Sequence, residues 1–217
     1  MRESKLLSAA VALVTAVFLL SAAIAAPILI RPFYYAQIGT LRIEEDTGLT
    51  PEQIRLAYDE MLDYCVGRSD SFSTGALRWS PEGKAHFDDV RGLFLLDLRL
   101  LAVSAVLLIL LFSASRFLRR PARLAGHGCL FWAGAGLGAL GILTGGLAAL
   151  DFDRAFTVFH TIFFPGKSNW LFDPDLDQVI TILPEAFFRN CALLILAILV
   201  VGCVLLIVSD FRGRKNA

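Results

Sequence analysis

Two histidines far apart in the chain have the chemistry of an acid–base pair. His86 and His160 are two of the three histidines in 217 residues. Imidazole exchanges protons near neutral pH because its unperturbed pKa is about 6.5, and two such groups can divide the roles of base and acid. The alternative is that each is an ordinary polar residue at a membrane surface. The third histidine, His127, lies in an arginine-rich loop, and we expect it to be solvated.

Other kinds of chemistry have weaker support. Two histidines with nearby acids could hold zinc, but the sequence has no HExxH-like register. A GxSxG serine elbow is absent. The four cysteines form no CxxC pair, and only Cys65 lies in a clearly polar segment. Quinone-linked disulfide oxidation would need paired external cysteines, which the chain lacks. With these alternatives weakened, we expect no metal and no cofactor.

Four long apolar runs must position the histidines. A bilayer core of about 30 Å requires about 20 apolar residues in a helix. The predicted spans cover about 6–30, 93–115, 129–150 and 187–209. The first run could be a cleaved signal peptide, but it is far longer than the usual apolar region of about 7–15 residues. The sequence therefore predicts an all-α membrane protein, with residues 1–217 forming a single membrane domain built as a four-transmembrane-helix bundle.

Composition agrees with this class. Hydrophobic residues make up 56% of the chain and charged residues 18%, which is not the balance of a soluble globular protein. The formal net charge is zero, so no basic surface points to nucleic acid. In the third span, four small residues at helical spacing favour close helix packing. They are Gly134, Gly138, Gly141 and Gly145.

Lysine and arginine predict the orientation, because cytoplasmic loops carry an excess of both. They cluster in the N-terminus, the short second loop and the C-terminal tail. These residues are Arg2, Lys5, Arg116, Arg119, Arg120, Arg123, Arg212, Arg214 and Lys215. Both termini should therefore be cytoplasmic, and the segments at about 31–92 and 151–186 extracytoplasmic. His86 and His160 fall in these two segments, so a site made by them would face outside.

Local signals indicate structure within the outer segments. Thr50-Pro51-Glu52-Gln53 reads as an N-cap, a proline at the first helical position and a capping-box Gln, and predicts a helix to about Cys65. Leu41–Glu44 has the character of a short strand. Ser80-Pro81-Glu82 begins a second helix that can run without a break into the second span. Asp173-Pro174 is expected to begin a short helix before the fourth span.

Charged residues near the second span are further candidates. Asp89 shares a helix face with His86, and we expect it to orient that ring. Asp97 and Arg99 lie at the outer end of the span, where ionisable residues often mark function. Arg99 would either hold the substrate or extend to a lipid headgroup.

Two segments resemble the bacterial lipoprotein intramolecular transacylase family. The more specific one runs from Phe159-His160 through Trp170 to Asp173-Pro174, followed by Ile182-Leu183-Pro184 and Phe187-Phe188. The other combines Ser80-Pro81-Glu82 with His86-Phe87-Asp88-Asp89-Val90. The resemblance extends to the plan of four spans and two external loops with one histidine in each.

This resemblance implies an activity, a location and a site. Family members move the sn-2 acyl chain of a diacylglyceryl lipoprotein to the α-amino group of the same N-terminal cysteine, giving a lyso-form lipoprotein in the bacterial plasma membrane. The paired catalytic histidines would be His86 and His160, with Asp89, Arg99 and Trp170 supporting them or binding substrate. The expected partners are the lipoprotein and membrane lipids, with no nucleic acid. The alternatives are a non-catalytic membrane component, such as a transporter subunit or assembly factor, and a lipid hydrolase.

Overall fold

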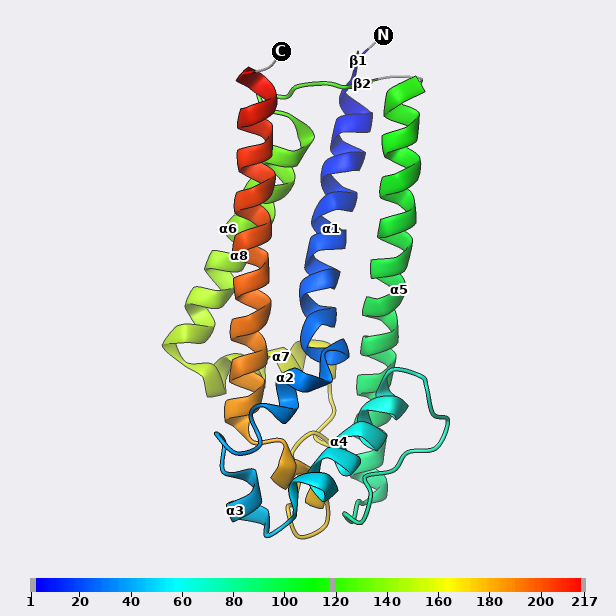
Figure 1. Ribbon diagram of the computed structural model, residues 1–217, viewed down its shortest axis with the longest axis vertical. Coiled ribbons are helices and arrows are strands. Elements are labelled where there is room, and N and C mark those ends of the chain that lie inside the picture. Colours follow the sequence, from blue (N-terminus) through cyan, green and yellow to red (C-terminus); the bar gives the residue numbers. More distant parts are fainter. Residues whose placement is uncertain (1–2, 118–119, 216–217) are drawn as a thin grey trace. The chain divides into compact units, whose positions relative to one another are not determined.

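The computed structural model describes residues 3–117 and 120–215, most of them helical (Figure 1). The elements are β1 (Glu3–Ser4), α1 (Lys5–Leu29), α2 (Arg31–Tyr35), α3 (Ile43–Thr47), α4 (Pro51–Cys65), α5 (Pro81–Phe117), β2 (Arg120–Pro121), α6 (Cys129–Leu150), α7 (Phe152–Phe163), the 3-10 helix η1 (Gln178–Ile182) and α8 (Glu185–Lys215). Among the described residues, α1, α5, α6 and α8 are long and apolar enough to cross a membrane. The predicted all-α membrane class is confirmed. Arg2 and Arg119, which the orientation argument used, lie outside the described residues.

The chain divides into two compact units, each built from segments distant in sequence. Unit 1 comprises Met1–Ile24, Asp97–Ala149 and Leu194–Ala217, and unit 2 comprises Ala25–Leu96 and Leu150–Leu193. His86 and His160 both belong to unit 2, whereas His127 and Arg99 belong to unit 1.

Small residues bring the helices of unit 1 close together. A Cβ atom added to Gly134 of α6 would lie 2.9 Å from the carbonyl oxygen of Cys203 in α8, and one added to Gly145 would lie 3.0 Å from Leu196. Gly202 of α8 likewise leaves room for the side chain of Leu19 in α1. The predicted close packing at the glycines of the third span is confirmed for Gly134 and Gly145.

A polar cluster closes one end of unit 1. There β1 pairs with β2 in parallel, and Leu124 and His127 flank a tight turn with positive φ at Ala125 and Gly126. This turn folds back so that the His127 ring stacks on Phe131 at 3.8 Å between centroids. Nδ1 of His127 also lies 3.5 Å from Oδ2 of Asp210 in α8. The prediction of a solvated His127 was therefore wrong.

In unit 2 the short helix α2 contacts α4, and both α3 and α4 contact η1. The capping box of α4 is present, since the Thr50 hydroxyl accepts from the Gln53 N–H and the Gln53 side chain accepts from the Thr50 N–H. The predicted helix ends at Cys65, as expected. The strand expected at Leu41–Glu44 is wrong. Arg42 takes a left-handed conformation with φ of 56° and starts α3, in which Ile43 is buried.

Candidate active site

The first turns of α5 carry His86 and are fixed by a distant carboxylate. The Ser80 hydroxyl accepts from the Gly83 N–H at 2.9 Å, so Ser80 acts as the helix cap. Oδ1 of Asp177 accepts from the Ser80 N–H at 2.7 Å, and Oδ2 accepts from the Ser80 hydroxyl at 2.9 Å. Asp177 is buried, with 5% of its surface exposed. The helix predicted from Pro81 into the second span is confirmed, and its start is tied to the segment that precedes α8.

Gly83 makes this contact possible. A Cβ atom at residue 83 would lie 2.0 Å from Oδ1 of Asp177, so only glycine admits the carboxylate. The short helix expected to begin at Asp173-Pro174 begins later, because this stretch forms a turn and the 3-10 helix η1 starts only at Gln178. The turn allows Asp177 to face Ser80. The Gln178 N–H donates to the Arg78 carbonyl, and the Arg78 N–H donates to the Gln178 side-chain oxygen, so the same two segments are held together.

His160 lies in the last turn of α7, which is a separate helix. Asp151 caps it, with Oδ1 accepting from the Arg154 N–H at 2.9 Å. The helix ends at Phe163 and does not continue into a span. Within α7, Nδ1 of His160 lies 2.8 Å from the Phe156 carbonyl oxygen one turn earlier.

The fold of unit 2 brings the two imidazoles together. Their ring centroids are 5.8 Å apart, with the planes at 31°. Only 5% of His86 and 7% of His160 is exposed. Phe164 contacts both rings, at centroid distances of 5.0 and 5.6 Å, while Trp170 stacks on His160 at 4.5 Å. The pair therefore lies in an aromatic enclosure that excludes most water.

A hydrogen bond fixes the tautomer of His160, whereas for His86 the tautomer follows from the burial of one ring nitrogen. A carbonyl oxygen can only accept, so Nδ1 of His160 carries the proton and Nε2 has a free lone pair. Nδ1 of His86 is buried without a partner. Because buried donors are left unsatisfied less often than acceptors, the proton of a neutral His86 belongs on Nε2. One ring thus offers an acceptor and the other a donor.

The surroundings of His160 also set its charge. Burial lowers the pKa of His160 below the ordinary value of 6.5, and the bond to the Phe156 carbonyl opposes this only in part. At neutral pH the ring is therefore uncharged, as a general base must be.

Asp89 has partners other than the one expected. Its Oδ1 lies 2.6 Å from Nζ of Lys167, and its Oδ2 accepts from the Asn169 amide at 3.4 Å. Among the described residues it makes no hydrogen bond to His86, so the predicted orienting contact is not found. Asp89 instead ties α5 to the loop after α7. Both Asp89 and Phe164 line a pocket of about 350 Å³.

The other predicted residues have different positions. Trp170 belongs to the enclosure, and its indole N–H donates to the Lys167 carbonyl at 3.1 Å. Arg99 is exposed and belongs to unit 1, as does Asp97, which is buried. The sequence reasoning missed Asp177, although the Ser80 cap that it binds was recognisable. In the described part of the chain, no three histidine, cysteine or acidic side chains gather as a metal site would require.

Comparisons with known proteins identify the family and the fold. The family model of the lipoprotein intramolecular transacylase Lit matches residues 9–188. The membrane integral Lit of Bacillus cereus has a similar structure, with 22% identity, a TM-score of 0.86 and coverage of 98% of this chain and 97% of that one.

Two further structures of the Bacillus cereus enzyme are similar. A histidine-to-arginine variant has 22% identity and a TM-score of 0.79 over 97% of this chain and 92% of that one. A histidine-to-alanine variant has 21% identity and the same TM-score, with coverage of 98% of this chain and 95% of that one. No curated protein sequence matches. Because the family match covers most of its length, the chain belongs to the lipoprotein intramolecular transacylase family and is an acyltransferase.

Proposed function

We propose that the enzyme moves the sn-2 acyl chain of a diacylglyceryl lipoprotein to the α-amino group of the modified cysteine, with His160 as base and His86 as hydrogen-bond donor. The observation that carries this proposal is the pair of buried imidazoles, 5.8 Å apart, in which Nδ1 of His160 is bound to the Phe156 carbonyl and Nδ1 of His86 is buried without a partner. Donor ester and acceptor amine belong to one substrate molecule. Attack closes a ring of about eight atoms, so the enzyme must supply positioning above all.

The proton path follows from the tautomers. Nε2 of His160 removes the proton from the amine as nitrogen attacks the sn-2 carbonyl carbon. The N–C bond forms while the carbonyl oxygen gains negative charge, which the Nε2–H of His86 stabilises. When the C–O bond to the glyceryl oxygen breaks, His160 returns the proton to that oxygen. The products are the amide and a free hydroxyl on the glyceryl group, and both histidines regain their starting state.

We further propose that the site faces the outside of the plasma membrane and that both termini are cytoplasmic. Support comes from unit 1, where basic segments gather at one end. There β1 pairs with β2 (Figure 1). At the same end the Asp210 carboxylate accepts from the Gly128 N–H at 3.0 Å and from Arg123 at 3.2 Å. A positive surface of this kind is typical of the cytoplasmic side.

Mass spectrometry of a lipoprotein N-terminus, in a host without other N-acylation, tests the proposal. The variants His86→Ala and His160→Ala should each reduce lyso-form production by about 10²–10⁴-fold while still inserting into the membrane. The variant His127→Ala, which removes the histidine of unit 1, is the matched control and should retain activity. Full activity in either of the first two variants would overturn the two-histidine proposal. Release of free fatty acid instead of transfer would indicate a lipid hydrolase.

A further inference from the structure

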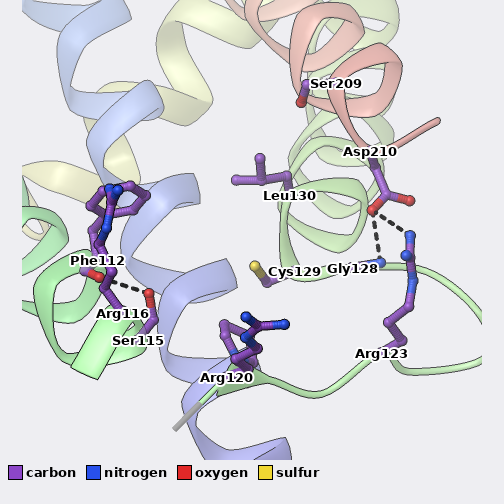
Figure 2. A pocket seen from close by; sticks show the side chains of 11 residues that line it. Phe112, Ser115, Arg116, Arg120, Arg123, Gly128, Cys129, Leu130, Ser209 and Asp210 are labelled. Atoms are coloured by element: carbon purple, nitrogen blue, oxygen red, sulfur yellow. Dashed lines mark hydrogen bonds and ion pairs between the residues drawn. The ribbon is translucent and has the colours of Figure 1, made fainter. Parts of the chain in front are cut away.

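A second pocket, of about 510 Å³, lies in unit 1 at the end that carries β1, β2 and the C-terminal part of α8 (Figure 2). Arg116 of α5, Arg120 of β2 and Arg123 of the following loop line it, together with Asp210. In the view of Figure 2, Arg120 lies between Arg116 and Arg123. Three arginines from different elements thus line one opening.

The charge of this pocket is not balanced by the protein. Asp210 is its one carboxylate, and it already accepts from the Arg123 side chain and the Gly128 N–H. Within residues 3–117 and 120–215, no acidic side chain pairs with Arg116 or Arg120. Two positive charges therefore remain, and a guanidinium matches phosphate oxygens better than any other side chain does.

The rest of the lining suits a lipid rather than a soluble anion. The pocket lies at the ends of α5, α6 and α8, all of which are able to span a membrane. Phe112 and Leu130 line it beside the arginines, and 65% of Phe112 is exposed. Basic pockets between membrane helices are suited to anionic headgroups, and an apolar side chain at the rim can contact the first carbons of an acyl chain.

We propose that this pocket binds the phosphate of an anionic phospholipid. Arg116 and Arg120 hold the phosphate oxygens, Arg123 completes the positive wall while it remains paired with Asp210, and Phe112 contacts the chain. A zwitterionic lipid binds less well, because the net positive wall repels its ammonium group. This site is separate from the transacylase reaction, which the residues of unit 2 carry out.

Native mass spectrometry of the full-length enzyme in detergent, titrated with phosphatidylglycerol, tests the proposal. Each basic residue near an anionic lipid contributes a factor of about five in affinity. We expect Arg116→Gln and Arg120→Gln to weaken binding by about fivefold each and the double variant by about 25-fold. Arg120→Lys, which keeps the charge, should lie between Arg120→Gln and the wild type.

The matched control is Arg212→Gln, which removes an exposed arginine from the same part of α8 but not from the pocket. Its affinity for phosphatidylglycerol should equal that of the wild type, and phosphatidylcholine should bind to both proteins more weakly than phosphatidylglycerol does. Unchanged binding in the double variant, or an equal loss in Arg212→Gln, would overturn the proposal. Displacement of the lipid by an equal concentration of inorganic phosphate would show a free-anion site instead.

Discussion

In unit 1 the helices pack through glycines and apolar side chains, whereas in unit 2 hydrogen bonds and ring stacks join segments far apart in the chain. The interior of unit 1 contains Ala23, Leu137, Leu199 and Cys203. In unit 2 the Tyr34 hydroxyl donates to the Ile182 carbonyl at 2.7 Å, across 148 residues. The Tyr34 ring also stacks on Tyr58 at 3.8 Å.

This difference teaches why the histidine pair belongs to unit 2. Apolar contacts are non-directional, so they do not by themselves fix the orientation of a polar group. A hydrogen bond weakens steeply when its angle or length departs from the optimum. Since a misplacement of about 1 Å can reduce a rate by about 100-fold, reacting groups are better fixed by directional bonds.

The pH profile of the reaction should give the largest effect, because it reports the surroundings of His160 directly. The amine, with a reference pKa of about 8, and His160 must both lack a proton for attack. At pH values below both pKa values, kcat/KM should fall about 100-fold for each unit by which the pH is lowered, because two protons must be removed. At pH values between the two pKa values, it should fall about tenfold per unit, because only the amine is protonated. Burial lowers the pKa of His160, so the steeper region should begin below about pH 6.5. A 100-fold slope already at pH 7 would contradict the tautomer and burial argument.

Removing the Asp177 carboxylate should give the next largest effect. Asp177→Ala leaves the Ser80 N–H and hydroxyl without their partner at the start of α5. Hydrogen bonds to a charged group contribute about 1.5–3 kcal/mol each. We expect a lower thermal midpoint in detergent and a reduced kcat, because the turn carrying His86 is released. Asp175→Ala, at an exposed residue of the same turn, is the control. An unchanged kcat in Asp177→Ala would show that directional bonds at this point do not position His86.

Features that depend on local sequence or on bilayer thickness could be predicted. The spans follow from apolar length, which the hydrocarbon core dictates. The capping box at Thr50 and the helix start at Pro81 follow from neighbouring residues. The strand expected at Leu41–Glu44 failed because burial of Ile43 and the left-handed Arg42 depend on the tertiary fold.

The candidate site could be predicted only in part. His86 and His160 were found from a resemblance in sequence motifs, but their separation follows from the fold. Asp177 binds Ser80 across 97 residues, and no local pattern reveals such a pair. Asp89 was assigned to His86 from helical spacing, which cannot show that Lys167, 78 residues later, approaches the same carboxylate.

Close packing in unit 1 can be tested on one helix. Gly134→Ala would place a Cβ atom 2.9 Å from the Cys203 carbonyl oxygen, so α6 and α8 must separate. Overpacking of this kind costs about 1–3 kcal/mol, which should lower the thermal midpoint. Gly136→Ala is the matched control, since nothing lies within 4 Å of its Cβ position, and alanine favours a helix by about 1 kcal/mol. Well below the midpoint, kcat of both variants should resemble that of the wild type. Equal thermal midpoints for Gly134→Ala and Gly136→Ala would contradict glycine-dependent packing.

The smallest effect should come from the Asp89–Lys167 ion pair, and it decides how Asp89 acts. The side chains are 24% and 47% exposed, and an exposed pair contributes at most about 1 kcal/mol. If Asp89 acts by holding Lys167, then Asp89→Asn and Lys167→Gln should each reduce kcat less than about fivefold. The double variant should lose no more than either single variant, because one interaction is removed in all three. If Asp89 instead orients His86, the kcat of Asp89→Asn should be far lower than the kcat of Lys167→Gln. The double variant should then show the sum of the two losses.

Added salt separates the same alternatives, since it screens an exposed pair. Salt should therefore lower kcat in the wild type and leave the Lys167→Gln variant unchanged.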